Sequence, residues 1–277
     1  MTVLVMTLLL AGGAFAAGLL GALTGLGGGL IIVPLLTLGF GVDLRYAIGA
    51  SLVSVIATSS GAAAAYVREG YTNIRVGMLL EVATTVGALV GAYAALVIAP
   101  HVIAVLFGLV LLFTAVQSLR PQEEHITEAS GTLARRLRLG STYPTPHGLQ
   151  HYEVQHVPLG FGLMFLAGIL SALLGIGSGV VKVLAMDRAM RLPFKVSTTT
   201  SNFMIGVTAA ASAGVYLTRG YIDPGLAMPV MLGVLAGALF GARVLTKART
   251  RTLRLLFTAV VVVLACEMLY KGLTGAF

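Results

Sequence analysis

Long apolar runs with few or no charged residues restrict the fold of this chain more than any other feature. Eight of them approach the roughly 20 residues that an α-helix needs to cross a bilayer. The runs lie near residues 2–26, 46–66, 76–97, 101–119, 157–181, 196–217, 224–242 and 255–270. Only 10% of the 277 residues are charged, against about a quarter in soluble domains. The sequence therefore predicts an all-α membrane protein that is surrounded by the lipid bilayer.

Two shorter apolar runs follow glycine-rich clusters, at 28–39 and 179–187. The first has 12 residues and as a helix would reach only about 18 Å, against a hydrocarbon core of about 30 Å. Such a segment is expected to be a short broken or re-entrant helix. Its irregular backbone can persist at membrane depth only where protein or water satisfies it.

A polar stretch at 120–156 divides the chain into an N-terminal membrane repeat (1–119) and a C-terminal one (157–277). Within the stretch, residues 132–138 suit a short surface helix. The stretch also contains His147, His151 and His156, whose mixed spacing favours a solvated loop over a metal site.

The basic residues indicate how the chain is oriented in the membrane. Fourteen of the 18 Lys and Arg residues fall in loops that alternating helices would place on one side, at 67–75, 120–156, 188–195 and 243–254. The positive-inside rule assigns that side to the cytoplasm. We therefore expect a multi-pass protein of the plasma (inner) membrane, with a cytoplasmic 120–156 loop and both termini outside. The basic net charge then reports orientation, and no nucleic-acid partner is expected.

The chain matches itself at a constant offset of 150 residues without a gap. Glycine, serine and threonine positions all recur in this register: Gly25, Gly27 and Gly29 at Gly175, Gly177 and Gly179, Ser51 at Ser201, and Thr58 at Thr208. The basic 243–254 loop has a mate, 93–104, without any basic residue. Matched loops should then lie on opposite sides, which predicts two inverted repeats of about five hydrophobic segments each. Inverted repeats with interrupted helices are typical of secondary transporters, whose sites lie near the bilayer midplane.

The two glycine clusters, G-L-G-G-G at 25–29 and G-I-G-S-G at 175–179, are the candidate binding elements. A helix that begins after such a cluster presents free N–H groups and a partial positive charge, which suits an anion. The same glycines also suit close packing of helices in a membrane. The candidate substrate-binding residues here are Gly27, Gly28, Gly29, Gly177, Ser178 and Gly179.

Hydroxyl and amide side chains on the following segments add further candidates. Ser51 and Thr58 share one helical face, and Thr200, Ser201 and Asn202 lie in the matching segment of the second half. Serine and threonine often only join helices in membranes. Both readings stay open for Ser51 and Ser201, the packing role is favoured for Thr58, and a ligand contact is favoured for Asn202 because an unpaired amide is costly.

Two charged residues lie within apolar segments. Lys182 follows Gly179 by three residues, and a charge inside a membrane segment points to function, here the neutralisation of a bound anion. Snorkelling, or pairing with Asp187, is the alternative. Glu81 could carry a coupling proton, although pairing with a loop arginine is the favoured interpretation.

Several motifs together resemble the TauE/SafE sulfite exporter family. The first is G-L-L-G-A-L-T-G-L-G-G-G-L-I-I-V-P-L-L at 18–36, which is followed by A-I-G-A-S-L at 47–52. The second glycine motif and R-G-Y-I-D at 219–223 look similar to it as well. The resemblance implies export of sulfite, or of related sulfur oxyanions and organosulfonates, across the plasma membrane. The halves are not equivalent, since Lys182 stands where the first half has Ile32.

These observations predict a secondary transporter that exports a small sulfur-containing anion by alternating access. The alternatives are an anion channel and a membrane enzyme or sensor. No catalytic constellation is visible in the spanning segments, so we do not expect an enzyme, and no cofactor is expected. A homodimer is compatible with the sequence.

Overall fold

Helices make up nearly all of the structure, a computed structural model that describes residues 3–24, 29–68, 70–119, 131–145, 148–245 and 250–275. The first half contains α1 (Val3–Thr24), α2 (Gly29–Pro34), the π-helix η1 (Leu35–Gly39), α3 (Leu44–Arg68), α4 (Ile74–Val97) and α5 (Pro100–Leu119). The second half contains α7 (Val157–Leu174), α8 (Gly179–Leu184), the π-helix η2 (Ala185–Ala189), α9 (Phe194–Thr218), α10 (Pro224–Leu245) and α11 (Thr250–Thr274). The prediction of an all-α membrane fold is confirmed.

The two halves repeat the same order of elements. The short helices, the π-helices and α3 with α9 all begin 150 residues apart, at the offset seen in the sequence. As expected, the apolar run after each glycine cluster forms a short helix, with six α-helical residues followed by five π-helical ones. Neither short helix is long enough to cross a bilayer alone.

Six described helices are long and apolar enough to span a membrane: α1, α4, α5, α7, α10 and α11. The other two long helices, α3 and α9, have 25 residues each and together carry more Ser and Thr residues than any other two helices. They pack against each other. The more polar helices therefore lie together, and more apolar ones surround them.

The exposure pattern of α4 shows which surface suits lipid. Large apolar side chains recur on its outer face about once per turn: Met78, Val82, Val86, Val90 and Val97 are all exposed. Its buried face carries Glu81, Thr84 and small residues such as Gly87 and Gly91. A soluble helix would bury the apolar face and expose the charge, so this helix is built for a lipid environment.

Glycines allow helices of the two halves to approach closely. A Cβ at Gly18 of α1 would clash with the Val234 carbonyl of α10, and one at Gly168 of α7 would clash with the Thr84 carbonyl of α4. Because Gly18 and Gly168 are 150-residue mates, the first helix of each half packs on the fourth helix of the other. Small residues at such crossings let two backbones touch inside a membrane.

Loops collect at the two ends of the molecule. At one end Asn73 donates to the Leu139 carbonyl (2.9 Å), and Gln155 N–H donates to the Met190 carbonyl (3.0 Å). At the other end Arg45 donates to the Leu96 carbonyl (3.1 Å).

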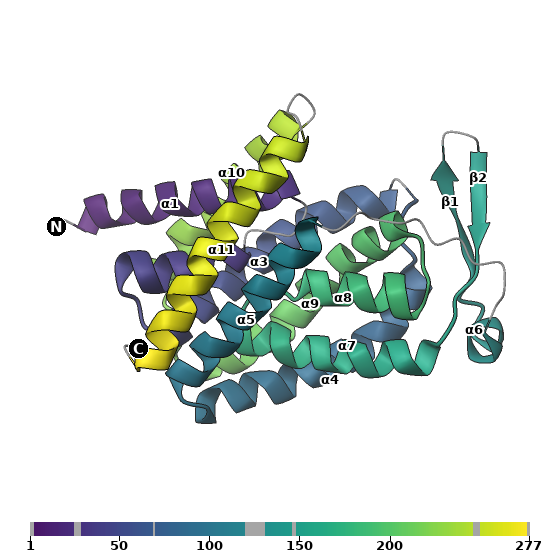
Figure 1. Cartoon of the computed structure of the whole chain (residues 1–277), viewed down its shortest axis with the longest axis horizontal. Coiled ribbons are helices and arrows are strands. Elements are labelled where there is room, and N and C mark those ends of the chain that lie inside the picture. Colours follow the sequence, from purple (N-terminus) through teal and green to yellow (C-terminus); the bar gives the residue numbers. More distant parts are fainter. Residues whose placement is uncertain are drawn as a thin grey trace.

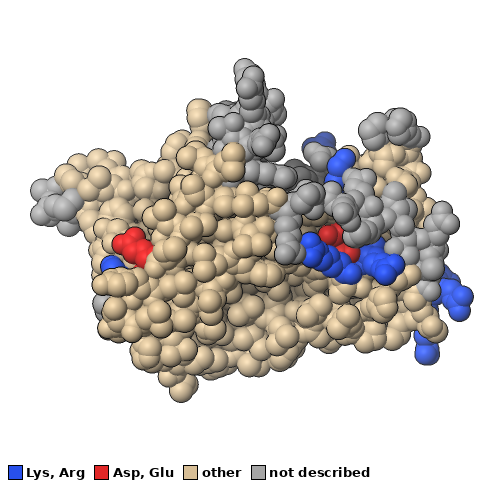
Figure 2. All heavy atoms as spheres, viewed as in Figure 1, with Lys and Arg blue, Asp and Glu red and all other residues tan. Residues whose placement is uncertain are grey.

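The N-terminal end of α1 and the C-terminal end of α11 lie at the end opposite the β-strands (Figure 1). On the face drawn in Figure 2, charged side chains gather toward the two ends and leave a broad uncharged band between them. The inverted relation of the halves and the side of the membrane that each end faces stay predictions.

The polar stretch folds more than the sequence suggested. The expected surface helix is present as α6 (Thr132–Arg136), but β1 (Ser141–Thr145) and β2 (Gly148–Tyr152) then form an antiparallel hairpin that we did not predict. Tyr143 and Tyr152 are buried, and Tyr152 OH accepts a hydrogen bond from the Asn73 side chain (2.8 Å). The hairpin thus docks on the α3–α4 loop. Residues 120–130 and 146–147, including His147, lie outside the described residues.

Replacing Gly168 with alanine should lower the free energy of unfolding by about 1–3 kcal/mol, the usual cost of overpacking. Its Cβ would press on the backbone of α4. A thermal denaturation series in detergent measures the effect. Gly162→Ala is the matched control on the same helix, where a Cβ meets nothing within 4 Å, and it should leave stability unchanged or slightly raised. Equal losses in both variants would contradict the proposed close contact.

Docking of the hairpin should weaken in alkaline solution. Burial raises the pKa of Tyr152 from 10.0 to about 12. The folded state therefore keeps the phenol proton that the unfolded chain loses above pH 10, so stability falls between pH 10 and about 12, by at most about 2–3 kcal/mol. Chemical denaturation across this range measures the slope. Tyr152→Phe should show a shallower slope than the parent protein, and an identical slope would contradict the assignment.

Candidate functional site at the two glycine turns

The second glycine turn, residues 175–178, interrupts the path between α7 and α8. Gly175 and Gly177 adopt φ values of +68° and +71°, a region that glycine enters without steric cost. Ser178 is also left-handed, at φ +47°, which costs a non-glycine residue about 1 kcal/mol. Its side chain is buried, and its hydroxyl has no hydrogen-bond partner among the described residues. The turn therefore holds strained backbone and a free buried hydroxyl.

The first short helix lies against the second glycine turn. Ser51 of α3 donates to the Gly175 carbonyl (2.7 Å), and its hydroxyl is 3.5 Å from the Gly29 carbonyl. A Cβ built at Gly29 would lie 3.4 Å from the Gly175 carbonyl oxygen. One hydroxyl thus links elements of both halves. The first glycine turn itself, residues 25–28 with Gly27 and Gly28, lies outside the described residues.

The second half repeats this contact. Ser201 of α9 donates to the Gly179 carbonyl (3.3 Å), just as its mate Ser51 faces Gly29. Val55 of α3 and Ile205 of α9 both touch the space where a Cβ at Gly177 would lie, at 3.2 and 2.9 Å. The second glycine turn is therefore enclosed by α3 on one side and α9 on the other.

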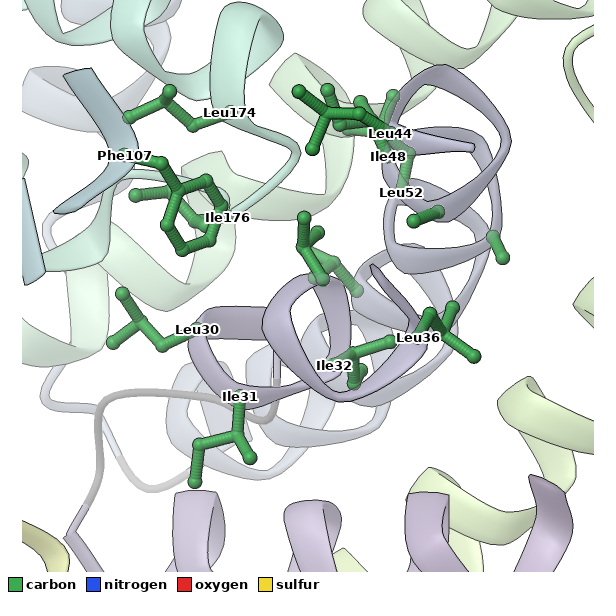
Figure 3. Packing of buried hydrophobic residues seen from close by; sticks show 14 of the residues in the cluster. Leu30, Ile31, Ile32, Leu36, Leu44, Ile48, Leu52, Phe107, Leu174 and Ile176 are labelled. Atoms are coloured by element: carbon green, nitrogen blue, oxygen red, sulfur yellow. The ribbon is translucent and has the colours of Figure 1, made fainter. Parts of the chain in front are cut away.

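Buried side chains anchor the first short helix on the same site. All six residues of α2 are buried. Figure 3 shows Leu30 pointing toward the side of Phe107 and Ile176, whereas Ile32 and Leu36 point the other way. Because Ile176 belongs to the second glycine turn, this packing fixes α2 relative to the other half.

Other candidates take different partners. Thr58 donates to the Ser54 carbonyl of its own helix (3.0 Å). Thr200 accepts a hydrogen bond from Asn73 N–H (3.0 Å), at the end of the molecule where the hairpin docks. Asn202 is half-buried. The structure thus gathers Gly29, Ser51, Gly177, Ser178, Gly179 and Ser201 around the second glycine turn, and it gives Thr58 and Thr200 contacts elsewhere.

Lys182, in the first turn of α8, is fully buried and does not snorkel. Its ammonium donates to the Thr208 hydroxyl (2.7 Å), and Thr208 donates in turn to Oε1 of Glu81 (2.8 Å). Thr85 donates to the same oxygen (3.1 Å). Lys182 and Glu81 are therefore two ends of one hydrogen-bonded chain, which we call the charge relay.

The sequence had suggested other partners for these charges. Glu81 was expected to pair with a loop arginine, but it lies 8% exposed against α9. For Thr208, as for its mate Thr58, the sequence favours a role in joining helices over a contact with the substrate. The position of Thr208 between Lys182 and Glu81 could not be predicted from the sequence, because the contact joins three helices, α4, α8 and α9, that are far apart in the chain.

Metal binding finds no support in the described part of the chain, where no group of three His, Cys, Asp or Glu side chains is close enough to hold an ion. His151 instead lies 3.0 Å from Glu153 on the exposed hairpin.

Comparison with known proteins decides the family. The sequence model of the sulfite exporter TauE/SafE family matches residues 10–268, nearly the whole chain. The chain belongs to the sulfite exporter TauE/SafE family. By family it is a multi-pass membrane transporter. The matched region includes both short helices and the polar stretch at 120–156.

Curated relatives of this chain carry transporter names. The chain is 26% identical to the probable membrane transporter protein YunE of Bacillus subtilis (strain 168), over 93% of this chain and 95% of the relative. It is 28% identical to the probable membrane transporter protein YdhB of the same organism, over 83% and 86%. A probable membrane transporter protein of Xylella fastidiosa (strain 9a5c) is 25% identical, over 93% and 91%. No solved structure matches the chain. These names indicate a transporter rather than an enzyme.

Removing the Ser51 hydroxyl should destabilise this TauE/SafE protein by about 1 kcal/mol, because the buried Gly175 carbonyl loses its donor. Ser54→Ala is the matched control, since the Ser54 hydroxyl bonds only within its own helix, to the Ala50 carbonyl (2.9 Å). Thermal unfolding in detergent compares the two. A loss in Ser54→Ala as large as that in Ser51→Ala would contradict a special role for the contact between the halves.

Proposed function

We propose that this protein is a secondary transporter that exports a small sulfur-containing anion across the plasma membrane by alternating access. The substrate would be sulfite or a related oxyanion or organosulfonate. The hairpin end would face the cytoplasm and both termini would lie outside. With the cytoplasm electrically negative, the membrane potential favours export of an anion by about 2.3 kcal/mol per charge per 100 mV.

The observation that carries the proposal is the fully buried Lys182 beside the second glycine turn. A cation buried among membrane helices is expensive and usually marks an ion or substrate path. Its helix begins at Gly179, so amide N–H groups of the first turn and the ammonium lie on one short segment. Backbone N–H groups at a helix start add a partial positive charge. Both features favour a negatively charged ligand.

The free hydroxyl of Ser178 supports the same location. A buried hydroxyl without a partner normally costs about 1–3 kcal/mol, and an oxyanion would supply the missing acceptor. Gly29, Ser51 and Ser201 border the same turn. Since the elements come from both halves, relative movement of the halves would open the site toward one side or the other, as it does in inverted-repeat transporters.

Flux into proteoliposomes tests the proposal, with sulfite, sulfate, thiosulfate and small sulfonates as substrates. We expect saturable flux of at least one of these anions down its electrochemical gradient. Flux that rises linearly with anion concentration and never saturates would support a channel instead. Absence of flux above that of empty liposomes for every anion would refute the proposal.

Lys182→Met should reduce this flux at least about tenfold, because loss of a buried charge partner commonly costs 2 kcal/mol or more. The single change leaves Glu81 without its counter-charge, so Lys182→Met combined with Glu81→Gln removes both charges and keeps the interior neutral. Both variants should lose flux. Lys271→Met, at the far end of α11, is the control and should transport normally.

A further inference from the structure

We propose that Glu81, joined to Lys182 through Thr208, binds a proton whenever the protein binds its anion, so that proton and anion cross the membrane together. This inference rests on the proposed function and adds the coupling ion to it.

The geometry of Glu81 leaves a place for the proton. Its Oε1 already accepts hydrogen bonds from Thr208 (2.8 Å) and Thr85 (3.1 Å). Its Oε2 is buried and has no hydrogen-bond partner among the described residues. A proton on Oε2 would therefore disturb none of the hydrogen bonds at Oε1. The carboxyl group can change its charge while the hydroxyls keep it in position.

Charge balance gives the reason for coupling. With Glu81 ionised and Lys182 protonated, the charge relay is neutral as a unit and Lys182 is engaged by its hydrogen bond to Thr208 (2.7 Å). An anion that binds at Lys182 adds a negative charge in a region of low dielectric, where unbalanced charge is costly. A proton on Glu81 removes one negative charge and restores the balance. Proton and anion therefore favour each other's binding, which produces cotransport rather than exchange. Because each proton cancels one negative charge, the membrane potential favours export only of an anion with two or more charges, such as the sulfite dianion, and the anion's own outward gradient supplies the rest of the drive.

Few other titratable side chains lie where they could bind the coupling proton in place of Glu81. Lys182 is the charged side chain that interacts with Glu81 from the neighbouring elements, and α7, which packs against α4, carries no titratable residue. The remaining titratable side chains of the packed elements lie toward the element ends: Arg75 and Tyr93 on α4, Asp187 and Arg188 on η2, and Lys195 and Tyr216 on α9.

The repeat sets the expected stoichiometry. At the 150-residue mates of Glu81 and Lys182 the other half has Met231 and Ile32, which cannot bind a proton. Thr58, the mate of Thr208, bonds within its own helix. Only one half can therefore form the relay, and we expect a single proton for each anion.

The test measures sulfite flux and proton movement together in proteoliposomes that contain a pH-sensitive dye. The parent protein should transport sulfite faster as the pH on the entry side falls. Glu81→Gln, which mimics the protonated carboxyl, should still transport but move one proton fewer per sulfite, with a pH profile that keeps only the titration of sulfite itself. The difference between the two proteins cancels the titration of sulfite itself. Glu267→Gln, which removes an exposed carboxylate on α11, is the matched control and should behave as the parent.

Thr208 provides a second route if Glu81→Gln fails to fold. Thr208→Val should flatten or shift the pH profile, and Thr208→Ser, which keeps the hydroxyl, should restore it. Parental proton counts and pH profiles in a transporting Glu81→Gln protein, or in Thr208→Val, would overturn the inference and leave the proposed function intact. Absence of flux for every tested anion in the parent protein would instead refute the proposed function.

Discussion

Backbone that leaves the helical path at membrane depth must be satisfied by the protein itself, because lipid offers no hydrogen bonds. The second glycine turn meets this demand with neighbouring helices. Ser51 supplies a hydroxyl to the Gly175 carbonyl, Gly175 N–H caps α7 on the Ser171 carbonyl (2.9 Å), and apolar side chains of α3 and α9 close the sides. The requirement explains why the two hydroxyl-rich helices lie together while more apolar helices face outward. The packing of the surrounding helices follows from the need to hydrogen-bond the backbone of that turn and to shield it from lipid.

Interlocking of the halves follows from the same requirement. The largest packing interfaces join α1 with α10, α4 with α7, α5 with α11, and α3 with α9. Each therefore pairs one helix of the first half with one of the second. The short helix α2 also rests partly on Ile176 and Phe107. The apolar surfaces of each half are buried mainly against the other half. Neither half is therefore expected to fold as a separate domain.

The charge relay breaks this symmetry. Two buried opposite charges rarely add stability, because loss of water costs about as much as their attraction returns. Lys182 and Glu81 therefore contribute little that apolar residues could not, as Ile32 and Met231 show at the matching positions of the first short helix and α10. Their presence in one half alone fits a functional demand, and the hydroxyl of Thr208 between them keeps the two charges connected.

The sequence by itself determined the membrane class, the order of the helices and the two broken segments. These follow from local quantities, namely the length of apolar runs, the position of glycines and the 150-residue register. It also singled out Lys182 and both glycine turns. The partners of Glu81 and the docking of the hairpin on Asn73 could not be read from it. Those contacts join residues far apart in the chain, and only the packing of α4 and α8 around α9 decided that Thr208 would stand between two charges.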